Sequence, residues 1–246
     1  MASITDDLRG GSDVDIGESV AVAAFSLARH FARSATLWCI SPQWPEHARH
    51  IAVEFVHPVL VGKRALPAVC IDVADPIAAL RSLVRSGDVV LAVSRGDSAT
   101  IVDVMRRAEA WGAMTIWMGA GPRPNGRAAD HIVWADNTHR VAGGATDSSA
   151  AVHDGRLVLL YHVLWELTHV CFEHPGLLST CESVEGGVCI TCSDEGRIGE
   201  VIASDGAHSA RVRTAHGVAS VDTTIVEVVP GDLVLIHAGA AITVVP

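Results

Sequence analysis

His50 and Glu54 are the first candidates for a functional site in this sequence. They lie four residues apart in the segment 45–57, whose pattern predicts a helix stopped at Pro58. Side chains at this spacing project from one face of a helix. An imidazole and a carboxylate together suit either a metal site or an acid/base pair. The structural alternative is a surface histidine beside a solvated glutamate.

Cys189 and Cys192 form a C-x-x-C pair with a different chemistry. A thiolate is a soft ligand that suits zinc or iron. A zinc ribbon would need a second pair, and Cys171 and Cys181 do not have the spacing to supply it. The alternative is that Cys189 is an ordinary exposed thiol.

The polar segment SRGDS at 94–98 stands between an apolar run and a helical pattern. Hydroxyls and backbone N–H groups at a helix N-terminus bind phosphate well. Ser94, Gly96 and Ser98 could supply these groups, although the carboxylate of Asp97 would repel a phosphate unless it points away. The alternative is a plain turn in which Asp97 or Ser98 caps the next helix.

The helices and strands that are expected to carry these residues follow an α/β pattern. The clearest unit is a strand at 88–93, the polar turn, a helix at 99–111 that ends at Gly112, and a strand at 114–118. Such a unit builds a parallel sheet with a crossover helix. The other expected helices lie at 17–34, 45–57, 78–86 and 153–173, and the other expected strands at 35–40, 66–73 and 131–134.

After residue 187 the pattern changes to short Val- and Ile-rich runs separated by turns, which predicts a small OB-like β-barrel. Its expected strands are 198–204, 207–214, 217–221, 224–228, 232–237 and 241–245. The expected domain organisation is a polar tail at 1–16, an α/β domain at 17–176, a linker at 177–187 and the barrel at 188–246.

Composition disfavours several classes of function. The formal net charge of −10 argues against binding of a phosphate backbone. No apolar run approaches the ~20 residues that a membrane-spanning helix needs. The segment 1–15 lacks the basic-then-apolar layout of a secretory signal. We therefore expect a cytoplasmic protein with reduced cysteines and with no nucleic-acid or membrane partner.

The segment 88–120 resembles sugar isomerase (SIS) domains. The layout of the whole α/β part looks like the phosphoheptose isomerase branch of that superfamily. The likeness rests on the strand–SRGDS–helix unit, on EHARHIAVEFV at 46–56, and on the long helix that carries His162. One departure is ISPQWP at 40–45, which stands where that branch has a G-N-G-G-S loop.

This resemblance implies a metal site. In the phosphoheptose isomerase branch, the residues that match His50 and Glu54 bind a metal with two ligands from the last helix. By position, these are Asp154 and His162 here. The resemblance implies a zinc-like site in which Glu54 and His162 also move protons between two sugar carbons through an enediol. The alternative for His162 is a core histidine.

The last sixty or so residues resemble the HypC/HupF family of hydrogenase assembly chaperones. Its GD-x-V-L-x-H-x-G-x-A-I signature is present as Gly231, Asp232, Val234, Leu235, His237, Gly239, Ala241 and Ile242. The resemblance implies transient handling of an iron–dicyanide–carbonyl unit, Fe(CN)2CO, by Cys189 and His237. Cys192 is the alternative thiol.

Two functions follow as expectations. The first is a [NiFe]-hydrogenase maturation factor that meets other maturation proteins or the large-subunit precursor, with an accessory SIS-like domain. The alternative is a metal-dependent phosphosugar isomerase, or a regulator that binds a sugar phosphate without turnover. The SIS resemblance also implies a homodimer or homotetramer.

Overall fold

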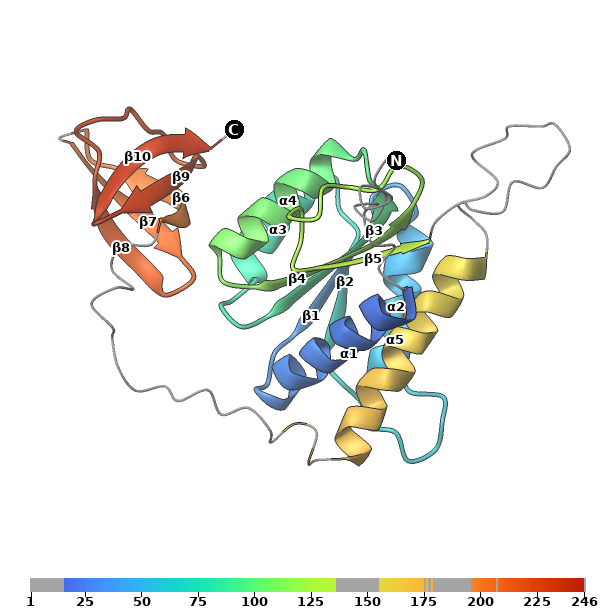
Figure 1. The fold of residues 1–246 in the computed structure, drawn as a ribbon. Coiled ribbons are helices and arrows are strands. Elements are labelled where there is room, and N and C mark those ends of the chain that lie inside the picture. The colour runs from blue at the N-terminus through green and yellow to red at the C-terminus, as the bar shows by residue number, and fades with distance from the viewer. Residues whose placement is uncertain are drawn as a thin grey trace, which may run out of the picture.

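The computed structural model describes residues 16–135, 155–174, 176, 178, 196–206 and 208–245. They form an α/β part and a small barrel (Figure 1). The helices are α1 (Ile16–Ala32), α2 (Pro45–Val56), α3 (Pro76–Leu83), α4 (Ala99–Ala110) and α5 (Gly155–Glu173). The strands of the α/β part are β1 (Leu37–Ile40), β2 (Ala68–Ile71), β3 (Val89–Arg95), β4 (Met114–Ala120) and β5 (His131–Ala135).

The strands of the α/β part form one five-stranded sheet in the order β2-β1-β3-β4-β5, and every neighbouring pair is parallel. The predicted strand–helix–strand unit is confirmed, since β3 and β4 pair from Val89↔Met114 to Arg95↔Ala120. In this doubly wound order, the direction of winding reverses between β1 and β3. Ligands of such sheets bind beyond the carboxyl ends of the strands at that point.

Alternate residues of the central strands bury against opposite layers of helices. One core cluster joins α1, α2 and α5 to one face of the sheet, with Leu91 and Ile116 at its centre. The other joins α3 and α4 to the opposite face through Val90 and Trp117. Because both faces are covered, β3 and β4 read as nearly continuous apolar runs. The sheet with helices on both faces confirms the fold class predicted for this part.

The barrel consists of β6 (Arg197–Ser204), β7 (Ser209–Thr214), β8 (Gly217–Asp222), β9 (Leu233–His237) and β10 (Ala240–Val245). These five strands close in the order β10-β8-β7-β6-β9, which confirms the predicted barrel. Within the described residues, no helix is long and apolar enough to cross a bilayer. The limits predicted for the tail and the linker fall in or beside undescribed stretches and stay predictions.

One predicted strand, 224–228, is wrong. The Asp222 carboxylate accepts a hydrogen bond from the backbone N–H of Thr224, and the N–H of Val226 bonds to the carbonyl of Thr223. These bonds turn the chain out of the ladder. Val226 and Val228 still pack against the barrel core, which explains why the segment reads as apolar.

The barrel contacts the α/β part through a buried carboxylate, Glu200 of β6, which is 1% exposed. Its Oε1 accepts bonds from Arg81 Nε (2.9 Å) and Arg107 Nη1 (2.6 Å), and its Oε2 accepts one from Trp111 Nε1 (2.7 Å). The guanidinium of Arg213 lies 5.1 Å from the centroid of the Trp111 ring. The side chains of α3 and α4 therefore hold the barrel on their face of the sheet (Figure 1).

Candidate metal centre

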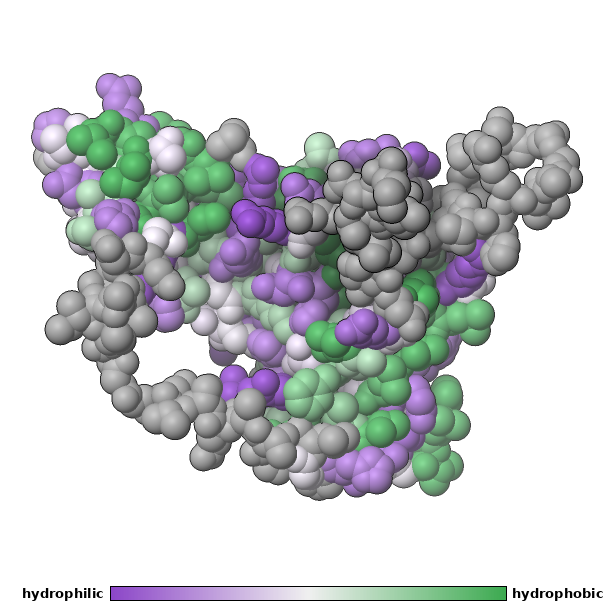
Figure 2. Space-filling view, viewed as in Figure 1, coloured by the Kyte–Doolittle hydropathy of each residue, from purple (hydrophilic) through white to green (hydrophobic). Residues whose placement is uncertain are grey.

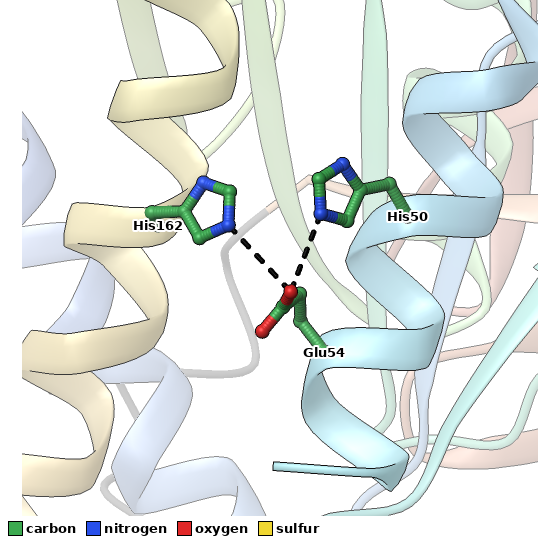
Figure 3. A group of neighbouring side chains, drawn as sticks. All are labelled: His50, Glu54 and His162. Carbon is green, nitrogen blue, oxygen red and sulfur yellow. Dashed lines mark hydrogen bonds and ion pairs between the residues drawn. The ribbon is translucent and has the colours of Figure 1, made fainter. Parts of the chain in front are cut away.

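Two helices bring His50, Glu54 and His162 together (Figure 3). Glu54 Oε1 lies 3.3 Å from His50 Nε2 and 3.6 Å from His162 Nε2. One possible ligand atom from each of the three residues lies within 4.8 Å of the others. Both histidine side chains are about two-fifths exposed, at 40% and 39%, whereas Glu54 is 15% exposed. The cluster is open to solvent on the imidazole side.

The local sequence explains where these side chains point. Pro45 occupies the first turn of α2, where its missing N–H costs no helical hydrogen bond. The helix buries its Ile51 and Phe55 face against the sheet, which leaves the His50–Glu54 face toward α5. The indole N–H of Trp165 on α5 donates to the backbone carbonyl of Glu54 at 2.8 Å. This bond fixes the two helices at the height of the cluster.

His162 has a defined tautomer when its ring is neutral. Its Nδ1 lies 2.7 Å from the carbonyl oxygen of Val158, which can only accept, so Nδ1 carries the hydrogen. The lone pair of Nε2 then faces the carboxylate of Glu54 at 3.6 Å. Two acceptors in this position repel each other, and a cation between them, either a proton on the ring or a metal ion, would remove that repulsion.

Tyr161 makes the corresponding bond to His50. Its hydroxyl lies 2.9 Å from His50 Nδ1. Burial raises the pKa of the Tyr161 phenol to about 12, and the carboxylates of Glu54 and Glu46 act in the same direction. The hydroxyl therefore stays protonated at physiological pH.

The three donors fit zinc. Two imidazoles and a carboxylate form a common zinc ligand set, and a tetrahedral zinc ion separates its ligand atoms by about 3.3 Å. The contacts of 3.3 and 3.6 Å match that spacing. Both imidazoles have their second nitrogen held by a neighbour, as zinc-binding histidines usually do. The predicted fourth ligand, Asp154, lies outside the described residues.

The predicted phosphate loop differs in part from expectation. Strand β3 continues through Arg95 instead of ending at Val93, so Ser94 lies inside the sheet. The Ser94 hydroxyl is fully buried, accepts from Trp117 Nε1 at 2.9 Å and lies 3.0 Å from the Arg95 carbonyl. A Cβ at Gly96 would lie 1.9 Å from the carbonyl oxygen of Pro122, so this glycine permits a close backbone approach.

Asp97 and Ser98 lie directly before α4. Asp97 pairs with Arg95 at 3.3 Å, and that hydrogen bond lowers the pKa of the Asp97 carboxyl. The arginine thereby offsets the charge that would repel a phosphate. Ser98 is the N-cap residue of α4, but its side chain makes no capping bond. The assignment of this loop to phosphate stays a prediction.

Four of the eight positions in the barrel signature have a structural explanation. Gly231 has φ +97° in the turn before β9, and Gly239 has φ +81° in the two-residue turn between β9 and β10. Val234 and Ala241 are fully buried in the barrel core. His237 ends β9 at that turn. Cys189 and Cys192 lie outside the described residues, so their pairing with His237 stays a prediction.

Sequence reasoning missed Tyr161, Trp165 and Arg95 as residues that support these sites. The first two belong to the buried face of α5, with Leu157, Leu164 and Thr168. A helical projection would have placed two aromatic residues with polar atoms on that face beside His162. Only the three-dimensional contact shows which polar atoms they meet.

Neither a protein-family model nor a curated protein sequence matches the chain. Solved structures with a similar arrangement include a phosphoheptose isomerase from Francisella tularensis, with 16% identity and a TM-score of 0.49, over 62% of this chain and 85% of that one. Another is a phosphoheptose isomerase from Neisseria gonorrhoeae, with 18% identity and a TM-score of 0.48, over 61% and 85%. At these values, the fold class rests on the strand order and pairing described above.

Proposed function

We propose that the α/β domain binds a divalent metal ion, best matched by zinc, through His50, Glu54 and His162. The observation that carries this proposal is the meeting of His162 Nε2 and the Glu54 carboxylate as two acceptors 3.6 Å apart, with His50 Nε2 beside them. A cation bound between these two acceptors would remove the repulsion between them. A metal ion bound there would polarise a carbonyl or hydroxyl oxygen of a small substrate.

The reaction class that we propose is aldose–ketose isomerisation of a polyhydroxy carbonyl compound. Such a reaction needs a base that removes a proton from the carbon next to the carbonyl, and an acid that returns one to the other carbon. Glu54 supplies a partly buried carboxylate, and the exposed Nε2 of His162 can carry a proton whenever it does not hold the metal ion. The resemblance to the phosphoheptose isomerase branch gives these same two residues the proton-transfer roles.

A phosphorylated sugar is the substrate that we favour. The first turn of α4 offers backbone N–H groups and the Ser98 hydroxyl, and Arg95 neutralises the charge of Asp97 beside them. Ser94 is not part of this proposed subsite, because its hydroxyl is buried and bonded. The hydroxyl of Ser41, in the segment that replaces the glycine-rich loop, is likewise buried and donates to the carbonyl of Val93.

The test is metal content and turnover of the full chain. We expect purified protein to hold close to one zinc ion per chain, and His50→Ala to lose it. Zinc-loaded protein should convert sedoheptulose 7-phosphate, and Glu54→Gln should abolish that conversion. Metal content near zero in the wild type, unchanged in His50→Ala and after incubation with zinc, would overturn the proposal.

A second function, hydrogenase maturation, concerns the barrel. It is favoured by the HypC/HupF-type signature, whose segment forms the β9–β10 hairpin with His237 at its turn. Several apolar side chains are also exposed on the barrel, where Figure 2 shows a green area among purple and white residues, as a protein partner would require. They are Ile202, Val218, Ile225, Val229, Ile242 and Val244.

In this second function, Cys189 and His237 would hold the Fe(CN)2CO unit as cargo, with maturation proteins or the large-subunit precursor as partners. The test is a pull-down of tagged protein from hydrogenase-expressing cells, with infrared bands of bound cyanide and carbon monoxide recorded. Bands that vanish in Cys189→Ala support it. Bands that vanish only in Cys192→Ala would move the role to the second thiol, and their absence from wild type would exclude it.

A further inference from the structure

The two histidines of the metal centre are held at Nδ1 by partners of different kinds. His162 Nδ1 meets the carbonyl oxygen of Val158, which accepts hydrogen bonds and cannot donate them. His50 Nδ1 meets the hydroxyl of Tyr161, which can do either. In its neutral form, His162 thus has one tautomer, whereas His50 has two that are both hydrogen-bonded.

Each His50 tautomer suits one state of the site. Without a metal, the Tyr161 hydroxyl can donate to Nδ1, and Nε2–H then donates to Glu54 Oε1 at 3.3 Å. With a metal, Nε2 must offer its lone pair, so Nδ1 carries the hydrogen and donates to the oxygen of Tyr161. The ring keeps its orientation in both states, because the same hydroxyl reverses its role.

We propose that Tyr161 is a positioning residue that lets His50 exchange tautomers when a metal ion binds. This inference rests on the metal site proposed above. In the exchange, Nε2 gives one proton to water and Nδ1 takes one up from water, so the ring is neutral before and after and the net number of protons is unchanged. His162 needs no such change, because its Nε2 already presents a lone pair in the neutral ring.

The packing of Tyr161 supports a positioning role. It is the only tyrosine in the chain, and its residue is 2% exposed. Its ring centroid lies 5.3 Å from that of His50 and 5.2 Å from that of His162, with His47 at 5.9 Å in an edge contact. The ring is enclosed by the cluster, and its hydroxyl oxygen is therefore held at His50.

The experiment compares zinc affinity of the metal-stripped full chain with Tyr161→Phe, by competition with a chromophoric chelator. This variant keeps the ring and removes only the hydroxyl. We expect zinc binding to weaken by about 10–100-fold, which is typical for loss of a residue that supports a metal ligand. Thr168→Val is the matched control, because it removes another buried hydroxyl from α5, one that bonds only to the carbonyl of Leu164 in the described structure.

Nitrogen-15 NMR of the imidazoles at pH 8 gives a readout that a purely structural role would not move. We expect His50 to carry its hydrogen on Nε2 in the metal-free protein and on Nδ1 in the zinc-loaded protein. His162 should carry it on Nδ1 in both. In metal-free Tyr161→Phe, His50 should stay in the Nε2–H form, which Glu54 alone then favours.

The outcomes separate the two proposals. If wild type and Tyr161→Phe bind zinc equally, or if His50 has the same tautomer with and without zinc, the role of Tyr161 is wrong while the metal site stands. If the wild type binds no zinc, the metal site itself is wrong, and the inference falls with it.

Discussion

Glu54 and Glu200 are two carboxylates that each lie between two basic side chains, yet their surroundings differ. Glu200 is 1% exposed and accepts short bonds of 2.6 to 2.9 Å from Arg81, Arg107 and Trp111. The Glu54 side chain is 15% exposed, and its contacts to His50 and His162 are longer, at 3.3 and 3.6 Å.

The chemistry of the donors explains the difference. Guanidinium and indole N–H groups do not lose their protons in proteins, so they satisfy a carboxylate permanently. Imidazoles exchange a proton for a lone pair, so the same geometry can receive a metal ion. The arginine-held carboxylate therefore serves docking of the barrel, whereas metal binding and proton transfer are the roles proposed for the histidine-held carboxylate. Matched substitutions at both glutamates test that division.

The largest expected effect is that of Glu200→Gln on stability. It removes the anionic partner of Arg81 and leaves Arg107 with Asp103 alone, at a mostly buried contact. Loss of one member of a buried ion pair costs about 3–5 kcal/mol, which urea unfolding would measure. Glu227→Gln, at an exposed position of the barrel, is the control and should change the free energy of unfolding little.

A cross-link would show whether that loss is a loss of docking. Ser86 Oγ donates to the carbonyl of Ala215 across the contact at 2.8 Å. Cysteines placed at 86 and 215 should form a disulfide quickly in the parent and slowly with Glu200→Gln. Equal rates in both backgrounds would mean that the barrel stays docked without Glu200.

Glu54→Gln is the matching substitution at the other carboxylate, and it should lower zinc affinity strongly while changing stability little. Zinc affinity should fall by more than about 100-fold, because even residues that only support a ligand account for about 10–100-fold. The free energy of unfolding of the metal-free protein should change by less than about 1 kcal/mol, since this contact is partly exposed and its bonds are long. Strong destabilisation without any loss of zinc would make Glu54 a structural residue like Glu200.

The sequence alone predicted features that depend on local signals, and it missed the contact that joins distant residues. Continuous apolar runs and Gly112 were enough to predict β3, α4 and β4, because those signals are local. The His50–Glu54 pair was also local, since it depends on one helical turn. The role of Glu200 could not be predicted from the sequence, because its partners Arg81 and Arg107 are 119 and 93 residues away.

Side-chain direction was the other limit. Ser94 was predicted to face a ligand, but in the structure its hydroxyl bonds to the indole of Trp117 on the neighbouring strand. The pattern of residues along one strand does not show which side chain of the neighbouring strand lies beside a given residue. The strand predicted at 224–228 failed for a related reason, since one Asp222 side-chain bond outweighed the apolar spacing.

Acid should reduce the contribution of Glu200 to the free energy of unfolding, and this effect is smaller than that of the substitutions above. Burial alone would raise the pKa of Glu200, but hydrogen bonds from Arg81, Trp111 and Arg107 together lower it below its ordinary value. A lowered folded-state pKa gives stability that is present above the unfolded-state pKa, about 4.3, and is lost as pH falls through the folded value. The difference in unfolding free energy between wild type and Glu200→Gln should therefore be constant near neutrality and shrink below pH 4. A difference that grows toward acid would mean that the Glu200 pKa is raised.

Arg107→Lys should have a still smaller effect, and it tests whether docking of the barrel needs only the charge of Arg107 or also the shape of its guanidinium. Arg107 Nη1 donates both to Glu200 Oε1 (2.6 Å) and to the carbonyl oxygen of Gly231 (2.7 Å), while its Nε donates to Asp103 (3.0 Å). Arg107→Lys keeps the positive charge, but a single ammonium group cannot reproduce the planar set of donors that reaches all three acceptors. We expect a loss of about 1 kcal/mol, the net value of a typical hydrogen bond.

The control for that substitution is Arg211→Lys, at an exposed position of β7, which should leave stability unchanged. If Arg107→Lys is equally neutral, charge alone holds Glu200, and Gly231 needs no donor from α4. A loss as large as that of Glu200→Gln would instead make Arg107 the dominant partner. The barrel signature would then be linked to the α/β domain through the carbonyl of Gly231, so that the first residue of the signature serves docking as well as the turn before β9.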